Sequence, residues 1–244
     1  MKAIVMAGGR GTRLGLLTND SINKHMVAVY DRPMITYPLA TLVRGGITDV
    51  RMSLNWRNPQ LLMECLEDGS KFGCRIHYTY NAQAFAGPAR HFMLSEEWAG
   101  GEDVVVMLGD SYFRFPLNFR QVKAPHIWTM PLDGMDDPSK YGQVEIDGDR
   151  VVRLVEKPKT LFSNRISTGC WVFPGDVFAM ARSMSDQPGE LQFGDLAMEY
   201  VRQGRMTHTA MPPGSYLDLG TPDALLKASQ LEASERNRQL IAAE

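Results

Sequence analysis

The sequence predicts an α/β protein with one doubly wound sheet, mixed but mostly parallel. Two apolar runs support this. Residues 3–6 open the chain, and residues 103–108 are mainly β-branched and apolar without alternation, which is typical of a strand buried on both faces. The third observation is spacing, because the segments between apolar runs read as helices that alternate with strands.

Proline, glycine and the apolar runs predict the other elements in order. A helix is expected from Pro33 to Val43, kinked at Pro38 and ended by Gly45-Gly46. The remaining predictions are strands at 49–54, 74–80, 127–132 and 168–173, an antiparallel pair at 141–146 and 151–156 joined at Asp147-Gly148, and helices at 59–67, 89–98, 191–203 and 225–244.

The length and the absence of repeats, low-complexity tracts and linkers predict a single domain, 1–244. Within it we expect one half at 1–110, a second half at 111–220 that carries the small antiparallel extension, and a C-terminal helix at 221–244.

Composition excludes several classes of protein. A net charge of −2 and a pI near 6.2 give no general attraction to polyanions, so nucleic acid is not an expected partner. The three cysteines, Cys65, Cys74 and Cys170, lack CxxC spacing and are expected as free thiols in a reducing compartment. No apolar run reaches the roughly 20 residues of a membrane span. We therefore expect a soluble, cytoplasmic protein with no membrane partner.

A glycine-rich turn follows the first strand. Gly8, Gly9 and Gly11 let the backbone approach a ligand closely, and successive amides of such a loop bind anions. Arg10 and Arg13 add two forked cations, so the turn predicts a polyphosphate site. It is not a P-loop, because no Lys follows Gly11. Leu14 breaks the dinucleotide fingerprint and disfavours an NAD-dependent oxidoreductase. An ordinary glycine turn is the structural alternative.

Two carboxylates are expected at the same edge of the sheet as this turn. Asp110 follows the strand at 103–108, and Asp218 ends a short strand near the C-terminus. Each is by itself typical of a turn or helix cap, but together, facing a phosphate site, they predict Mg²⁺ binding. Lys157 ends the second hairpin strand before Pro158, where it is either a phosphate contact or a solvated surface lysine.

Eight motifs occur in one order over nearly all of residues 1–230, and on them the chain resembles the sugar-1-phosphate nucleotidyltransferases, closest to the glucose-1-phosphate thymidylyltransferases. The motifs are Met6–Leu14, Val29–Ile35, Leu108–Asp110, Asp137–Gly142, Val155–Pro158, Thr168-Gly169, Gly189–Leu191 and Leu217–Thr221. The resemblance implies a Rossmann-like nucleotidyltransferase fold with a small antiparallel sugar-binding extension.

The resemblance also implies an activity and a set of roles. A sugar 1-phosphate attacks the α-phosphorus of a nucleoside triphosphate, and pyrophosphate leaves. Arg10 and Lys24 would neutralise the triphosphate, Asp110 and Asp218 would hold Mg²⁺, and Lys157 would hold the sugar phosphate. The implied nucleotide-binding residues are Ala7, Gly8, Gly9, Gly11, Thr12, Arg13, Asn81, Gln83 and Gly87, and the implied sugar-phosphate-binding residues are Gly142, Glu156, Lys157, Thr168 and Gly169. A homo-oligomer, dimer or tetramer, is implied as well.

Several positions depart from the family pattern. The base loop is one residue longer, so either Asn81 or Gln83 faces the base; an amide suits thymine or uracil, which predicts dTTP or UTP as donor. Ser111 stands where the usual motif is Gly-Asp-Asn, Pro188 where an Arg often clamps the sugar phosphate, and Tyr216 where a Trp is usual.

The departures leave other readings open. His25 replaces a usual Gln and is a candidate phosphate contact, and Arg90 is a candidate substitute for the absent Arg. His25 and His91 lack a second ligand at metal spacing. The alternatives to a dTTP- or UTP-dependent enzyme are a nucleotidyltransferase with another base or acceptor and a catalytically weak regulatory paralogue that binds nucleotide sugar. Longer members add C-terminal helices with an effector site, so weak feedback inhibition is expected.

Overall fold

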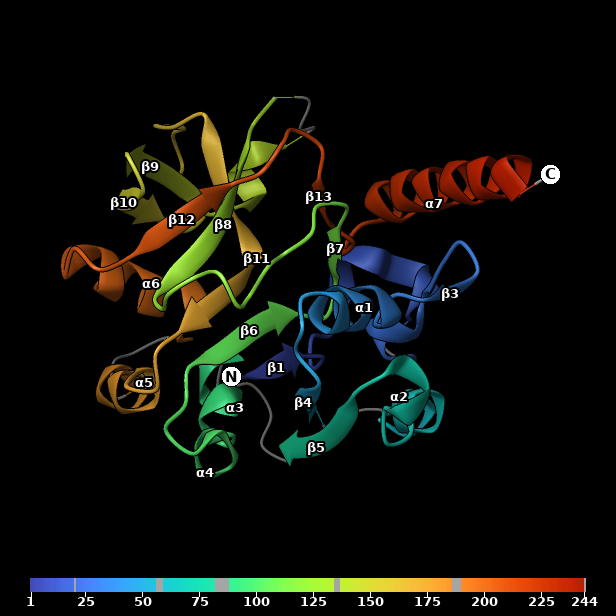
Figure 1. Ribbon diagram of the computed structural model, residues 1–244, viewed down its shortest axis with the longest axis horizontal. Helices are drawn as coiled ribbons and strands as arrows, with labels where there is room; N and C mark the ends of the chain where they lie inside the picture. The colour runs from blue at the N-terminus through green and yellow to red at the C-terminus, as the bar shows by residue number, and fades with distance from the viewer. Residues whose placement is uncertain (20, 56–58, 82–87, 134–136, 186–189, 244) are drawn as a thin grey trace.

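Figure 1 shows the computed structural model of the protein, which describes residues 1–19, 21–55, 59–81, 88–133, 137–185 and 190–243. Within these ranges, nine strands form a sheet in the order β5-β4-β1-β6-β11-β8-β12-β10-β9. They are β1 (Lys2–Met6), β4 (Asp49–Asn55), β5 (Arg75–Asn81), β6 (Val104–Leu108), β8 (His126–Pro131), β9 (Gln143–Asp147), β10 (Arg150–Val155), β11 (Arg165–Phe173) and β12 (Thr207–Ala210).

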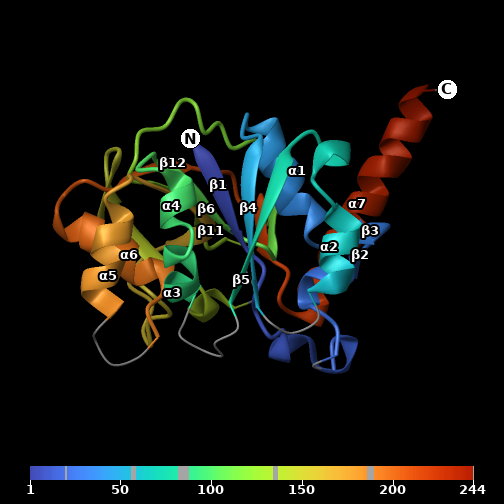
Figure 2. The same cartoon turned by 90° about the horizontal axis from the view of Figure 1, so that it is seen from below.

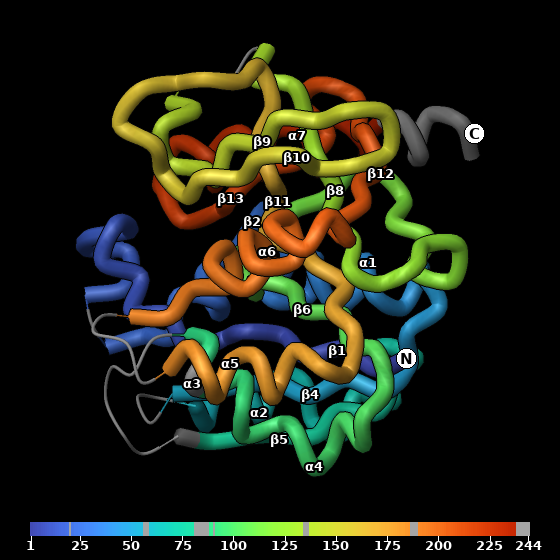
Figure 3. The backbone as a smooth tube through the Cα atoms, turned by 90° about the vertical axis from the view of Figure 1, so that its left-hand side faces the viewer, coloured from blue at the N-terminus to red at the C-terminus, as the bar shows by residue number. Residues whose placement is uncertain are grey.

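Two small sheets complete the strands. β2 (Ala28–Val29) pairs with β3 (Arg32–Pro33), and β7 (Ser111–Phe113) pairs with β13 (Tyr216–Asp218). In the large sheet, β5, β4, β1 and β6 are parallel, whereas every other pair except β12–β8 is antiparallel. Figure 3 shows the β9–β10 hairpin and β5 at opposite ends of the molecule. The predicted mixed α/β fold and the predicted hairpin are confirmed. The sheet is not mostly parallel as expected, because antiparallel pairings that involve β8 to β12 are at least as numerous as the parallel ones among the described strands.

Helices cover both faces of the sheet (Figure 2). They are α1 (Thr36–Arg44), α2 (Gln60–Leu66), α3 (Pro88–Met93), α4 (Glu96–Ala99), α5 (Val177–Ser185), α6 (Phe193–Arg202) and α7 (Pro222–Ala243). A hydrophobic core lies on each face of the sheet. Alternate residues of β1 pack into one core or the other, because successive side chains of a strand point to opposite faces. Val5 packs in the core with α1 and α2, while Ile4 packs in the core with α3, α5 and α6.

Two predicted helices have different limits. Pro33 belongs to β3, and α1 begins at Thr36, so Pro38 lies in the first helical turn, where its missing N–H costs no intrahelical bond. No kink is therefore needed at Pro38. The predicted helix 89–98 is two short helices, α3 and α4, because the chain turns at Leu94-Ser95 with Ser95 fully buried. Helix α5 and strand β12 were not predicted from the sequence.

None of the helices in the described part of the chain combines the length and apolar character needed for a membrane span. The long helix α7 lies beside the body at its start and extends away from it towards the C-terminus (Figure 1). Leu225 and Ala228 of α7 pack with Tyr112 on β7, and the Tyr112 hydroxyl donates to Glu232 at 2.6 Å. This contact ties α7 to the small β7–β13 sheet.

A buried histidine in the sheet predicts a pH-dependent stability. His126 on β8 is 4% exposed, its Nδ1 lies 2.8 Å from Thr207 Oγ1 of β12, and its ring packs on Trp128. Burial, and then the charge of His208, lower the pKa of His126 to about 4. The unfolded chain has an ordinary histidine pKa near 6.5, so below that pH protons bind the unfolded state in preference.

The His126 contribution to stability is therefore complete above about pH 6.5 and is lost as pH falls towards 4, by about 3 kcal/mol in total. Urea unfolding of the wild type and of His126→Gln between about pH 7.5 and about pH 4 measures this, since the difference between the two curves isolates His126 from the carboxylates. If the free energies of unfolding of the two proteins changed with pH by the same amount, the prediction would be contradicted.

Candidate active site

A cavity of about 640 Å³ opens at the carboxyl ends of β1 and β6 and extends to the hairpin β9–β10. Two groups of polar residues line it. One is Gly8, Gly9, Arg10, Arg13, Lys24, Asp110 and Asp218; the other is Lys140, Tyr141, Gly142, Glu156, Lys157, Ser167, Thr168 and Gly169. The first group comes from the end of the cavity at the parallel strands β1 and β6, with Asp218 added from β13 of the small sheet. The second group comes from the antiparallel part of the large sheet and the segments beside it, so the cavity joins the two parts.

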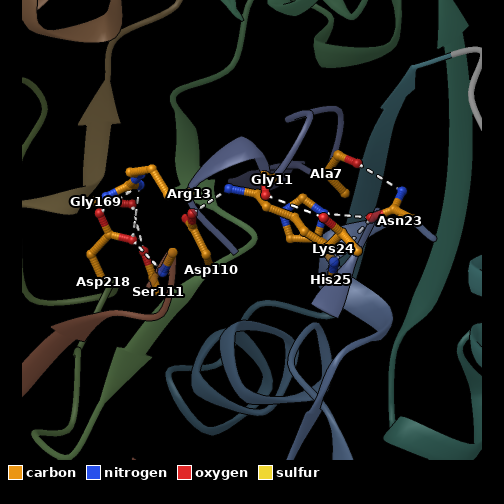
Figure 4. Close-up of polar contacts among 12 residues, drawn as sticks. Ala7, Gly11, Arg13, Asn23, Lys24, His25, Asp110, Ser111, Gly169 and Asp218 are labelled. Carbon is orange, nitrogen blue, oxygen red and sulfur yellow. Dashed lines mark hydrogen bonds and ion pairs between the residues drawn. The ribbon is translucent and has the colours of Figure 1, made fainter. Parts of the chain in front are cut away.

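Lys24 lies across the glycine turn (Figure 4). A Cβ at Gly9 would lie 2.9 Å from Lys24 Cε, and one at Gly11, where φ is +70°, would lie 2.7 Å from Lys24 Cβ. These two glycines thus make room for the lysine as well as for a ligand. Asn23 holds the lysine segment in place, because its amide nitrogen donates to Ala7 O at 3.2 Å and its oxygen accepts from His25 N at 3.0 Å.

Asp110 follows β6 and is nearly buried, 6% exposed. Its carboxylate forms a close ion pair with Lys24, whose side chain is 12% exposed (Figure 4). Burial alone would raise the pKa of Asp110, but the attraction of Lys24 outweighs it and the pKa is lowered. Gly109 before it has no room for a Cβ, which would lie 2.7 Å from the His25 ring.

The small β7–β13 sheet brings the second carboxylate beside the first. Asp218 pairs with Ser111 in this sheet, and Leu219 N donates to Asp110 O at 2.9 Å. One Asp218 oxygen accepts from Gly220 N at 2.8 Å, and the other lies 3.1 Å from Arg13. Burial, and then the charge of Asp110, raise the pKa of Asp218. Each carboxylate therefore has a cationic partner within the protein.

Glu156 and Lys157 stand at the other end of the cavity, where β10 ends. Two glycines flank the Glu156 carboxylate, since a Cβ at Gly142 or at Gly194 would lie 2.8 or 3.0 Å from Oε2. Burial raises the pKa of Glu156. Lys157 Nζ lies 3.7 Å from Glu156, and its side chain is 64% exposed, so its ammonium is accessible to a ligand.

The cavity collects most of the residues predicted from the sequence. Among the residues that line it are Gly8, Gly9, Arg10, Arg13, Lys24, Asp110, Gly142, Glu156, Lys157, Thr168, Gly169 and Asp218. Ala7, Gly11 and Thr12 are not among the residues that line it; Ala7 is fully buried and its N–H donates to Ser53 O, whereas Thr12 is exposed. Gln83, Gly87 and Pro188 lie outside the described residues, as do the side chains of Asn81 and Arg90.

His25 has a structural role. It is 1% exposed, does not line the cavity, and its Nδ1 lies 2.8 Å from Asn23 Oδ1. Burial, and then the charge of Lys24, lower its pKa to about 3, so the ring is neutral near pH 7. The hypothesis that His25 contacts phosphate is wrong, because the ring packs against Gly109 instead.

Sequence reasoning missed several cavity residues. Asn55 at the end of β4, Trp171 on β11 and Phe193 at the start of α6 all line the cavity. Asn55 had a detectable signal, since it ends a parallel strand at the same edge as Asp110. The two aromatic residues had none, because within an apolar strand and an amphipathic helix they read as ordinary core residues.

This geometry can be compared with known proteins. A model of the nucleotidyl transferase family matches residues 2–235. The glucose-1-phosphate thymidylyltransferase of Mycolicibacterium smegmatis is 33% identical over 248 residues, 98% of this chain and 84% of the relative; that of Neisseria meningitidis is 32% identical over 246 residues, 98% and 85%. The chain therefore belongs to the nucleotidyl transferase family. It is a nucleotidyltransferase.

Solved structures agree on the fold. A Bacillus anthracis protein in complex with sucrose superposes with a TM-score of 0.85 at 29% identity, covering 95% of this chain and 94% of that one. The inositol-1-phosphate CTP transferase of T. maritima superposes with a TM-score of 0.82 at 22% identity, with the same coverage, and at that identity the likeness concerns the fold alone.

Proposed function

We propose that this enzyme transfers a nucleotidyl group from dTTP or UTP to a sugar 1-phosphate, such as glucose 1-phosphate, and releases pyrophosphate. The observation that carries the proposal is one cavity with two adjoining carboxylates, Asp110 and Asp218, between a cationic glycine turn and a second cation, Lys157. The named thymidylyltransferase relatives support the sugar-phosphate acceptor.

The proposed roles follow from charge and position. Arg10, Arg13 and Lys24 line the end formed by the glycine turn, where they neutralise the triphosphate and the departing pyrophosphate. Lys157 receives the phosphate of the acceptor, and Glu156 with Gly142 lines the pocket for its sugar. The acceptor oxygen then attacks the α-phosphorus in line with the leaving pyrophosphate. The protein contributes positioning and charge neutralisation, with no covalent step of its own.

The donor set fits Mg²⁺. Asp110 and Asp218 supply hard carboxylate oxygens, which Mg²⁺ prefers, and the described residues hold no group of three metal-ligating side chains. One or two carboxylates together with substrate phosphates and water are the usual environment of Mg²⁺ at nucleotide sites. When bound there, Mg²⁺ would neutralise charge on the reacting phosphates.

The same proposal assigns a separate role to each half of the chain. Residues 1–110 provide the nucleotide side and residues 111–220 the acceptor side. The base is read by the loop that follows β5, with Asn81 or Gln83 as the amide and Gly87 in the loop. Thymine and uracil share the edge that an amide can pair with, and the thymine methyl adds only about 1 kcal/mol of burial. A second copy of this chain is the proposed partner in a homo-oligomer.

A pyrophosphate-release assay tests the proposal. With glucose 1-phosphate as acceptor, we expect dTTP and UTP to be used with kcat/KM values within roughly tenfold of each other, and CTP and GTP to be poor. Preference for CTP or a purine would show that another base is read. Equilibrium binding of a nucleotide sugar without pyrophosphate release would indicate a regulatory paralogue instead.

A further inference from the structure

Strand β11 has a gap in its pairing where it lines the cavity. Against β8 its register passes from Ser167 to Trp171 with a shift, and against β6 the pairing begins at Cys170. Gly169 therefore lies where neither neighbouring strand continues the ladder. A buried backbone N–H or C=O without a partner is costly, so such groups are nearly always satisfied in another way.

Two side chains from the small β7–β13 sheet form hydrogen bonds with the backbone groups of Gly169. Its N–H donates to the Tyr216 hydroxyl at 3.0 Å, and its carbonyl accepts from the Ser111 hydroxyl at 3.3 Å (Figure 4 shows Ser111 and Gly169). Both side chains are buried, at 3% and 0% exposure.

Ser111 and Tyr216 lie on the paired strands β7 and β13, so the two contacts with Gly169 close into a ring through this small sheet, which we call the Gly169 ring. The Ser111 hydroxyl donates to the Gly169 carbonyl, and the Tyr216 hydroxyl accepts from the Gly169 N–H. The loss of either hydroxyl therefore leaves a Gly169 backbone group unpaired.

The space around Gly169 is also restricted. A Cβ at Gly169 would lie 2.5 Å from Ser111 Oγ and 2.8 Å from Tyr216 Oη. Glycine is therefore required here by close approach, and the two hydroxyls are what crowd the position.

The ring links the two sides of the reaction. Ser111 is adjacent to Asp110, and Tyr216 is two residues before Asp218, so both side chains share a short sheet with the carboxylates. On the other side, Thr168 precedes Gly169, lines the cavity and is 2% exposed. Among the described residues its Oγ1 has no hydrogen-bond partner, which points to a contact with a ligand.

We propose that Ser111 and Tyr216 are positioning residues that hold Gly169 and Thr168 at a fixed place relative to Asp110 and Asp218, so that the acceptor's sugar-phosphate group meets the Thr168 hydroxyl. The inference rests on the proposed function. Both are positions where the motifs of the resembling family carry other residues, and the ring shows that the two departures act together.

Kinetics of Tyr216→Phe and Ser111→Ala test the positioning role. Each variant is expected to raise KM for the sugar 1-phosphate about tenfold. The Kd of a non-hydrolysable triphosphate analogue, measured without acceptor, should stay within about twofold of the wild type. Because the ring acts as a unit, the double variant should be no worse than the poorer single variant. The matched control is Tyr112→Phe, which removes a hydroxyl from the same small sheet outside the ring and should leave the acceptor KM unchanged.

A second experiment uses the crowding at Gly169 and requires no turnover. Gly169→Ala should lower the thermal unfolding midpoint clearly in the wild-type background, and less in the Ser111→Ala/Tyr216→Phe background, because the hydroxyls that would meet the new Cβ are gone. Any of three results would overturn the proposal. The first is an equal loss of the thermal unfolding midpoint in both backgrounds, and the second is an unchanged KM for the sugar 1-phosphate in the single variants. The third is equal weakening of acceptor binding and of nucleotide binding. A wild-type protein that turns over no sugar phosphate would instead refute the proposed function. The unfolding experiment would still show whether the Ser111 and Tyr216 hydroxyls crowd Gly169.

Discussion

Asp110→Asn and Asp218→Asn are each expected to lower kcat by at least about a thousandfold in the pyrophosphate-release assay. The two carboxylates adjoin across the β7–β13 pairing and supply the hard oxygen ligands of the proposed Mg²⁺ site. An amide keeps the shape of each side chain and removes its negative charge. Asp223→Asn, an exposed carboxylate in the first turn of α7, is the matched control and should retain wild-type kcat.

The two variants should differ in stability, which separates catalysis from folding. Asp110 is the ion-pair partner of a nearly buried Lys24, and removing one partner of a buried pair costs about 3–5 kcal/mol. Asp218 pairs with Arg13, whose side chain is 47% exposed, so its loss costs about 1 kcal/mol or less. Urea unfolding measures both values. Near-normal turnover in both variants at low Mg²⁺ would refute the assignment of the metal ligands.

Metal binding is expected to depend strongly on the nucleotide. Lys24 and Arg13 pair with Asp110 and Asp218, so the four side chains are neutral together and a divalent cation that binds alone must displace one of these two cations. A triphosphate brings negative charge that both cations can bind, which releases the carboxylates. The affinity for Mn²⁺, followed by electron paramagnetic resonance of the free ion, should rise at least about tenfold when a non-hydrolysable triphosphate is present.

Variants of Lys24 and Arg13 are expected to change the affinity for Mn²⁺ to different extents. Lys24→Met should strengthen Mn²⁺ binding without nucleotide by about tenfold or more, because Lys24 and Asp110 are both nearly buried. Arg13→Gln should do so by only about threefold, since its ion pair is largely solvated. Both should weaken triphosphate binding, and Asp110→Asn serves as the control that loses the metal. Equal Mn²⁺ affinity with and without nucleotide in the wild type would contradict the prediction.

The sequence was informative where one physical cause dominates. Strands β1 and β6 could be predicted because a strand buried on both faces must be apolar throughout. The position of Asp110 followed from β6, since parallel strands end at a shared edge. The end of α1 followed from its two glycines.

The rest depends on contacts that no local pattern encodes. Lys24 meets Asp110 from 86 positions away because Asn23 fixes its segment against the first strand, and nothing in the surrounding sequence marks that contact. The break between α3 and α4 arises where Ser95 is buried, although the residues on both sides favour one continuous helix. The Gly169 ring joins three distant segments, so Ser111 and Tyr216 read only as isolated substitutions.

The pairing of β7 with β13 also has a consequence for biosynthesis. Asp110 is synthesised well before its neighbour Asp218, which lies on β13, the last strand in the part of the chain that the structure describes. A nascent chain that ends before Tyr216 therefore has the glycine turn and one carboxylate but not the pair. Such long-range pairing forms late, because the intervening loop must close first. The two carboxylates can thus be brought together only after the chain has been synthesised through Asp218, more than a hundred residues after Asp110.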